Sequence, residues 1–290
     1  METQKLVQEL KKANEAYRSG NPVMTDSEYD YLKKKLESLD PDNDFLKGVE
    51  PEPESISRER EKVKHPFPML STDKAYSREE LQKFVNRMGK YTSNPKFHIT
   101  PKLDGLSARY SNGKVFTRGD GEAGFDISDC IKKGVVVDTD MDCVGEIVLN
   151  EPYFLSSLVF DYPHPRNVVA GGCMALEMSE TQKETFESGY VKFYPFKDLP
   201  YVEVDGEGLL ENIEEIFFNL CNNIEFPTDG VVISLVCDDK TKTEIGHTSH
   251  HHRWQIAYKK QTEVAETYVE SITWQTGRGG NITPVLEVTP

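Results

Sequence analysis

The chain has 290 residues, of which 37% are hydrophobic and 29% are charged, which suits one sizeable core with a smaller satellite domain. Its 34 basic and 49 acidic residues give a net charge of −15, so any groups that bind a polyphosphate must be gathered in one cleft or supplied from elsewhere. No apolar run approaches membrane-spanning length and no signal-peptide core opens the chain, so we expect a cytoplasmic protein with no membrane partner. The five cysteines form no Cys-x-x-Cys pair, so we expect reduced thiols and no zinc site.

Two helices are expected near the N-terminus. Apolar residues recur at helical spacing over residues 6–17 and again over residues 29–39, and a Thr-x-x-Glu capping box that begins at Thr25 opens the second helix. One face of the second helix carries three side chains at positions i, i+3 and i+4, namely Asp26, Tyr29 and Asp30. These helices predict a small helical domain, followed by a charged linker over residues 41–64.

The stretch Ile99–Gly124 holds the strongest candidate for chemistry. Its Asn112-Gly113 pair, flanked by residues that favour strands, predicts a two-residue hairpin turn. Lys102 and Asp104 then share one face of the hairpin, and Arg118 returns along the paired strand. Desolvation and neighbouring cations lower the pKa of a lysine and free its lone pair for attack on phosphorus or a carbonyl. This pattern predicts an activated amine nucleophile, although a Lys-x-Asp pair alone also fits an exposed ion pair.

A glycine-rich bend follows the hairpin and raises an alternative. Gly119–Gly124 has the spacing G-x-G-x-x-G, and Asp138 and Asp140 come about twenty residues later, as in a Rossmann dinucleotide fold. However, Asp120 and Glu122 would direct carboxylates at a pyrophosphate, and the hairpin is antiparallel instead of opening a βαβ unit. A Rossmann dehydrogenase is therefore not expected.

Charged residues also stand within later strands. Glu146 lies amid valine, isoleucine and leucine, where a carboxylate is costly unless it meets a cation, a sugar hydroxyl or a metal ion; a glutamate on an edge strand is the alternative. Residues 253–259 alternate, with Gln255, Ala257 and Lys259 on the face opposite Trp254, Ile256 and Tyr258. The adjacent histidines 250–252 cannot all face one ion in regular structure, so they predict a solvated loop.

Two motifs, Lys102-Leu-Asp104-Gly and Thr117-Arg-Gly-Asp-Gly121, resemble the nucleotidyltransferase core of the NAD-dependent DNA ligases of bacterial or viral type. The resemblance extends over nearly the whole chain. Residues 21–32 are similar to the family's clamp for the nicotinamide mononucleotide (NMN) half of NAD. Residues 272–284 are similar to the strand that opens the family's oligonucleotide-binding (OB) barrel. The other segments that carry the resemblance are residues 65–71, 164–171 and 226–234.

The resemblance implies an α+β fold. A nucleotidyltransferase core, ATP-grasp-like with antiparallel sheets, would follow a small N-terminal helical domain and precede the opening strand of an OB-fold. The expected domains are residues 1–60 for the helical NMN-binding domain and linker, 61–262 for the adenylation domain, and 263–290 for the start of the OB-fold. The remaining OB-fold, zinc and helix-hairpin-helix domains would have to come from missing C-terminal domains or a second chain.

The resemblance also implies an activity. An NAD-dependent DNA ligase of DNA replication and repair forms lysyl-AMP from NAD with Mg²⁺ and releases NMN. The AMP then passes to the 5′-phosphate of a nick in double-stranded DNA, which is sealed. The alternative is a catalytically weakened module that binds NAD, or acts as a scaffold, beside a partner ligase chain.

The family's functional residues map onto this sequence. The catalytic residues implied are Lys102, Asp104, Arg118, Glu146 and Lys259. The residues implied to contact the nucleotide are Tyr17, Asp26, Tyr29, Asp30, Ser71 and Arg166. Four positions depart from the family's pattern. Arg18 stands where histidine is usual, and Thr100 stands where a glutamate that contacts adenine is usual. Met174 replaces the family's second arginine, and Ser234 replaces a lysine that contacts phosphate. These departures predict reduced or partner-dependent activity.

Overall fold

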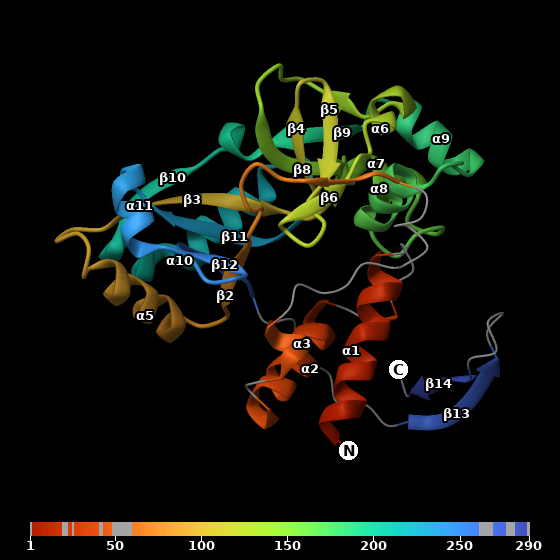
Figure 1. Ribbon diagram of the computed structural model, residues 1–290, viewed down its shortest axis with the longest axis horizontal. Helices are drawn as coiled ribbons and strands as arrows, with labels where there is room; N and C mark the ends of the chain where they lie inside the picture. The colour runs from red at the N-terminus through yellow and green to blue at the C-terminus, as the bar shows by residue number, and fades with distance from the viewer. Residues whose placement is uncertain are drawn as a thin grey trace. The chain divides into compact units, whose positions relative to one another are not determined.

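The computed structural model describes the chain in segments (Figure 1). The described residues are 2–18, 23–24, 26–40, 43–47, 60–260, 269–276 and 282–288. The chain divides into two compact units, Met1–Lys260 and Gln261–Pro290. The first unit holds helices and two five-stranded sheets, and the second holds a pair of strands.

The N-terminal helices are α1 (Glu2–Arg18), α2 (Asp26–Leu39) and the short α3 (Asp44–Lys47). The first two pack together through the apolar positions that the helical spacing predicted, and the fully or nearly buried members of that cluster are Leu6, Leu10 and Leu36. Both expected helices are confirmed. The expected capping residue Thr25 lies outside the described residues.

The first five-stranded sheet has the order β10-β3-β11-β12-β2. Neighbouring strands are antiparallel except for β12 and β2, which are parallel. Its strands are β2 (Ser71–Ala75), β3 (Lys96–Leu103), β10 (Val202–Asp205), β11 (Thr228–Leu235) and β12 (His251–Tyr258). The helices that share its core are α5 (Arg78–Met88), α10 (Gly206–Asn222) and α11 (Asp239–Ile245).

One face of this sheet is apolar and packs against α5 and α10. On β3, Phe97 and Ile99 are fully buried in a core cluster that includes residues from both helices. Side chains alternate across a strand, so the polar residues between and beyond them, His98, Thr100 and Lys102, project from the opposite face. The hydrophobic packing of one face therefore leaves the other face available for polar chemistry.

The second five-stranded sheet has the order β5-β4-β8-β9-β7. Its strands are β4 (Leu106–Ser111), β5 (Lys114–Thr117), β7 (Val136–Val137), β8 (Cys143–Leu149) and β9 (Val191–Pro195). The helices after or beside it are α6 (Asp129–Lys133), α7 (Glu151–Ser157), α8 (Pro165–Met174), α9 (Glu180–Glu187) and the 3₁₀ turn η1 (Phe196–Asp198). Its core contains fully buried residues from strands and helices, among them Ile147 of β8, Val168 of α8 and Phe186 of α9. The mixed α+β class is thus confirmed.

The Asn112-Gly113 turn joins β4 to β5, as predicted. Both residues have positive φ, 51° and 75°, which this tight turn requires. The expectation that Lys102 lies on this hairpin was wrong, because Lys102 belongs to β3 of the first sheet. The chain passes from one sheet to the other at Asp104 and Gly105, where a β-carbon on Gly105 would lie 2.1 Å from the Ile147 carbonyl oxygen. Glycine is therefore needed at the crossing.

Two smaller strand pairs complete the described structure. β1 (Lys62–Lys64) pairs with β6 (Ala123–Phe125), and β13 (Val269–Thr276) pairs with β14 (Ile282–Val288) in the second unit. The glycine-rich bend therefore joins two strands, β5 and β6, and opens no helix, which argues against the Rossmann alternative. The expectation of an unstructured linker over residues 41–64 was wrong in part, since α3 and β1 lie within it.

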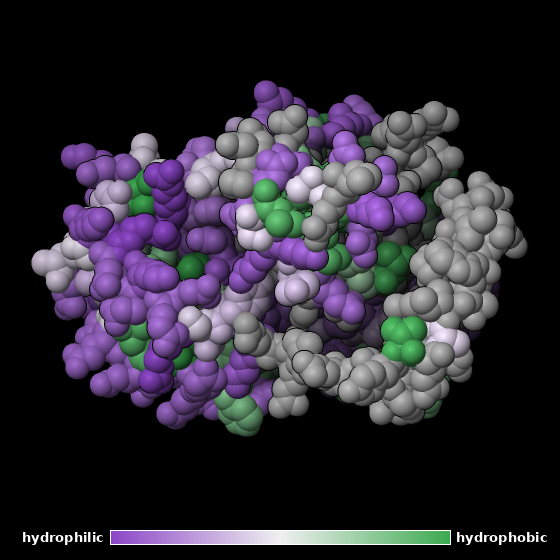
Figure 2. All heavy atoms as spheres, turned by 90° about the horizontal axis from the view of Figure 1, so that it is seen from below, coloured by the Kyte–Doolittle hydropathy of each residue, from purple (hydrophilic) through white to green (hydrophobic). Residues whose placement is uncertain are grey.

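The surface of the described chain is largely polar. Figure 2 shows hydrophilic side chains over most of the coloured part of one face, with hydrophobic residues scattered between them. No described helix combines the length and the apolar character that a membrane span needs.

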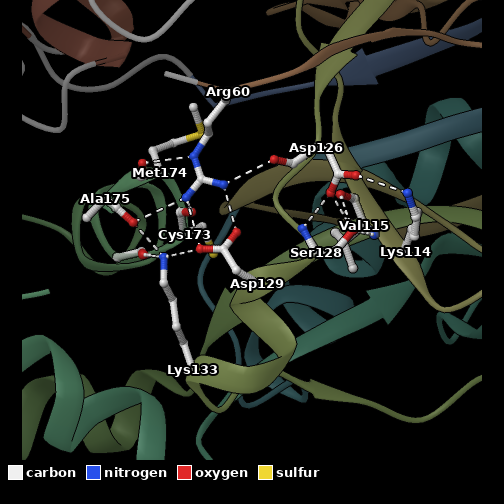
Figure 3. Close-up of polar contacts among 11 residues, drawn as sticks. Arg60, Lys114, Val115, Asp126, Ser128, Asp129, Lys133, Cys173, Met174 and Ala175 are labelled. Carbon is white, nitrogen blue, oxygen red and sulfur yellow. Dashed lines mark hydrogen bonds and ion pairs between the residues drawn. The ribbon is translucent and has the colours of Figure 1, made fainter. Parts of the chain in front are cut away.

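Arg60 anchors the start of the second sheet's domain (Figure 3). Its side chain is 7% exposed, and its guanidinium donates to both carboxylate oxygens of Asp129. It also donates to the carbonyl oxygens of Asp126, Cys173, Met174 and Ala175. Lys133 donates to the carbonyl oxygens of Gly172 and Ala175 beside it. These two cations satisfy the carbonyl groups at the end of α8, which the helix itself cannot pair.

We predict that Arg60→Ala lowers the free energy of unfolding by about 3 kcal/mol, because it removes one of the two cations paired with Asp129 and leaves the carbonyl oxygens of Cys173 and Met174 without this donor. Urea denaturation followed by circular dichroism measures the change. The matched control is Lys62→Ala, whose ion pair with Asp120 is largely exposed and whose loss should cost less than about 1 kcal/mol. If Arg60→Ala and Lys62→Ala lowered the free energy of unfolding equally, the result would contradict the anchoring role of Arg60.

Candidate active site

A cavity of about 1390 Å³ lies against the polar face of the first sheet. It is lined from the first sheet by Lys102, Asp229 and Lys259, and from the second sheet and its connections by Asp104, Arg118, Glu146 and Arg166. All five predicted catalytic residues therefore line one cavity. Its volume exceeds that of a typical small-ligand pocket, which suits a large nucleotide.

Asp229 joins two lysines at the floor of this cavity. Its Oδ1 lies 2.8 Å from the Lys102 Nζ, and its Oδ2 lies 2.8 Å from the Lys259 Nζ. The strand register explains the meeting, since Gly230 of β11 is the partner of Lys102 on β3 and Lys259 directly follows β12. Burial raises the pKa of Asp229, but the two lysines lower it by more, so it stays below its usual range.

Sequence reasoning missed Asp229. The signal available was an Asp-Gly pair at the start of a buried Val-Val-Ile strand, which marks a carboxylate at a strand end but does not say what faces it. Its two partners are remote in the chain, so only the assembled sheet brings the three side chains together.

The protonation of Lys102 differs from the expectation. Burial lowers the pKa of this lysine, but Asp229 raises it, as do Asp104 and Glu146, and the net pKa lies above the ordinary lysine value. The expected lowering of the pKa by neighbouring cations was therefore wrong, because carboxylates surround the amine. Lys102 is held as an ammonium ion in this arrangement.

Asp104 is held from the N-terminus of α8. The Arg166 Nη1 lies 2.6 Å from Asp104 Oδ1, and the His164 Nε2 lies 3.4 Å from Asp104 Oδ2. His164 also caps α8, since its Nδ1 accepts a hydrogen bond from the Arg166 backbone N–H at 3.3 Å. Burial raises the pKa of Asp104, and Arg166 partly offsets that rise. Arg166, predicted to contact the nucleotide, thus lies at the cavity and orients a second candidate residue.

Glu146 lies on β8, which is a central strand, so the edge-strand alternative was wrong. It is 8% exposed, and burial raises its pKa to about 8 despite the opposing effect of Lys102. No hydrogen bond to its carboxylate is found within the described residues. A buried carboxylate in this state favours a proton or a cation.

Arg118 and Ser71 link the two sheets across the cavity. The Arg118 Nη1 donates to the Ser71 Oγ at 2.6 Å, and Ser71 begins β2 of the first sheet. The backbone carbonyl of Arg118 lies 3.1 Å from the Nε2 of the buried His65. Both predicted residues are therefore fixed at the cavity wall.

The predicted NMN clamp is only partly described. Tyr29 is half-buried on α2, packs against the leucine cluster of the helical part, and also lines the cavity. The side chains of Tyr17, Asp26 and Asp30 lie outside the described part of the structure. Their contact with NMN remains a prediction.

The histidine run differs from expectation. His251 and His252 begin β12, and histidines 250–252 line the cavity, so the prediction of a solvated loop was wrong for this stretch. Within the described residues, no group of three or more His, Cys, Asp or Glu side chains is placed to hold a metal ion. A cation at this cavity would thus need oxygen ligands from water or substrate besides those of the protein.

Comparison with known proteins identifies the family. Residues 57–193 match the model of the NAD-dependent DNA ligase adenylation domain. The DNA ligase of Desulfatibacillum aliphaticivorans is 43% identical over 98% of this chain, and that of Shewanella baltica is 36% identical over 97%. Residues 57–193 are therefore identified with the adenylation domain of the NAD-dependent DNA ligases. The chain covers 46% and 44% of the length of these two ligases, so it spans about half of the relatives that it matches.

The buried Glu146 predicts that the stability of the chain depends on pH. Its pKa is about 8 in the folded chain and about 4.5 when exposed, so the folded state holds the proton more tightly. Its contribution to stability is complete below pH ~4.5 and is lost as the pH rises toward 8. When the pH rises from 5 to 8.5, we expect the free energy of unfolding of Glu146→Gln to increase by about 3 kcal/mol relative to that of the wild type.

Urea unfolding in EDTA at the two pH values measures this gain. Glu215→Gln, which removes an exposed carboxylate from α10, is the matched control and should show no such gain. A Glu146→Gln difference that stays constant with pH would contradict the raised pKa.

Proposed function

We propose that this chain is the adenylation part of an NAD-dependent DNA ligase. Its domains are an NMN-binding helical domain with linker in residues 1–60, an ATP-grasp-like nucleotidyltransferase core in residues 61–262, and the start of an OB-fold in residues 263–290. The observation that carries the proposal is Lys102 of the family's motif, set in a cavity beside the cations of Lys259 and Arg118.

Lys102 is the nucleophile of the proposed reaction. Its unprotonated amine attacks the adenylyl phosphorus of NAD, so an N–P bond forms while the P–O bond to NMN breaks and NMN leaves. The ammonium must first lose a proton to solvent, because Asp229, 2.8 Å away, has a pKa below its usual range and holds Lys102 charged. Because Asp229 also pairs with Lys259, it can release Lys102 and keep a charged partner.

Lys259 and Arg118 offset the negative charge that develops on the phosphate oxygens. Phosphoryl transfer depends mainly on positioning and on such electrostatic stabilisation. Ser71 orients Arg118 through their 2.6 Å hydrogen bond. The adenosine ribose lies beside Asp104 and Glu146 in this proposal, and Tyr17, Asp26, Tyr29 and Asp30 hold the NMN half.

Asp104 and Glu146 also fit Mg²⁺. Their carboxylates are the hard oxygen ligands that Mg²⁺ prefers, and Mg²⁺ commonly takes one or two of them besides substrate phosphates. The buried Glu146, which has no hydrogen-bond donor within the described residues, is the better candidate of the two. When bound, the ion would supply further charge neutralisation at the phosphate.

The AMP then passes to the 5′-phosphate of a nick in double-stranded DNA, and the 3′-hydroxyl displaces it. The net charge of −15 opposes a firm grip on DNA by this chain alone. We therefore propose that further domains (OB-fold, zinc and helix-hairpin-helix) or a second chain supply most DNA contacts. The longer family relatives, of which this chain spans about half, support that view. A non-catalytic scaffold is not favoured, because all five catalytic candidates line the cavity.

The test is the transfer of AMP from NAD. We predict that the wild-type chain, incubated with NAD and Mg²⁺, gains the mass of one AMP on Lys102, and that Lys102→Ala gains none. Lys197→Ala is the matched control, because Lys197 lines the same cavity but pairs with Asp198, and it should be labelled like the wild type. Intact-protein and peptide mass spectrometry measure both.

A melting temperature that rises with NAD while no adduct forms would contradict the enzymatic proposal and favour a binding module.

A further inference from the structure

A row of polar side chains crosses the cavity face of the first sheet, away from the reactive lysines. The strand register places His98 of β3 opposite Ser234 of β11, and Ser234 opposite Gln255 of β12. All three residues line the cavity that contains Lys102. His98 precedes Lys102 by four residues on the same strand, which corresponds to about 13 Å along the sheet.

The surface between this row and Lys102 carries no charge. Thr100 and Val232 are partners in the register midway along it, and both line the cavity. A small hydroxyl and a small apolar side chain form a floor on which a ribose and a flat base can lie. The separation along β3 between the backbone positions of His98 and Lys102 is comparable to the length of an extended nucleoside monophosphate.

Within the row, the Gln255 amide has hydrogen-bonding capacity to spare. The His98 Nε2 lies 3.0 Å from the Glu203 carboxylate, and its ring stacks on Tyr201 with centroids 4.3 Å apart. The Gln255 Nε2 donates to the Ser234 Oγ at 2.9 Å, which fixes the plane of the amide. No further hydrogen bond of this amide is found among the described residues.

We propose that Gln255, oriented by Ser234, recognises the adenine base of the nucleotide that Lys102 attacks. A glutamine amide can accept from the adenine 6-amino group and donate to an adjacent ring nitrogen, a two-point match that glutamine makes with adenine. Gln255 is then the residue that contacts the base, and Ser234 is a positioning residue. This inference rests on the proposed function, since it names the feature of NAD that the same cavity selects.

The experiment compares NAD with nicotinamide hypoxanthine dinucleotide, in which an oxo group replaces the 6-amino group. We expect wild-type adenylation to favour NAD by about 10-fold to 100-fold in kcat/KM. In Gln255→Leu the preference should fall to within about threefold, and in Ser234→Ala it should be intermediate. Gln82→Leu, a matched change on the exposed face of α5, should keep the wild-type preference.

A second measurement does not depend on the reaction. AMP should raise the melting temperature of the Lys102→Ala protein more than IMP does, and the added Gln255→Leu change should abolish the difference. If the wild type shows no preference between the bases, or if Gln255→Leu retains it, the inference is overturned. Failure of the wild type to form any adduct would overturn the proposed function alone, because the AMP and IMP comparison still reports on Gln255.

Discussion

The carboxylate of Asp229 lies between two lysine amines that come from different strands, and the candidate site is built around this contact. Lys102 ends β3 and Lys259 follows β12, and β11 carries Asp229 between them. The two lysines lower the pKa of Asp229, and Asp229 in turn raises the pKa of Lys102. The contact depends on the apolar face of the sheet, because packing against α5 and α10 fixes the register that aligns these strands.

The second sheet supplies the remaining charges at the point where the chain crosses between sheets. Gly105 allows the close crossing, Arg166 and His164 hold Asp104, and Glu146 lies buried on a central strand. Arg60 donates to carbonyl oxygens at the C-terminus of α8, the helix whose N-terminus carries Arg166. The acidic chain thus places Lys102, Lys259, Arg118 and Arg166 at one cavity, and such a local group of cations is what a chain with a net charge of −15 needs to bind a nucleotide.

Local sequence signals predicted the parts of the fold that local interactions decide. The Asn112-Gly113 turn, the N-terminal helices and the alternation that places Lys259 opposite the apolar face all follow from residue type and spacing. The break between β3 and β4 was not predicted, because the hairpin pattern placed Lys102 and Asp104 together, and only the close contact of Gly105 with Ile147 of another strand reveals the crossing. The sign of the Lys102 pKa shift also escaped prediction, since it depends on Asp229, 127 residues away in the chain.

Asp229 controls the protonation of the Lys102 amine in this structure. The most direct measurement is an NMR titration of the Lys102 Nζ in protein labelled with ¹⁵N-lysine, with Lys102→Arg used to assign the signal. The account predicts that Lys102 titrates above the ordinary lysine pKa in the wild type and that Asp229→Asn lowers this pKa. A Lys102 signal that titrates at or below the ordinary value, and does not respond to Asp229→Asn, would contradict it.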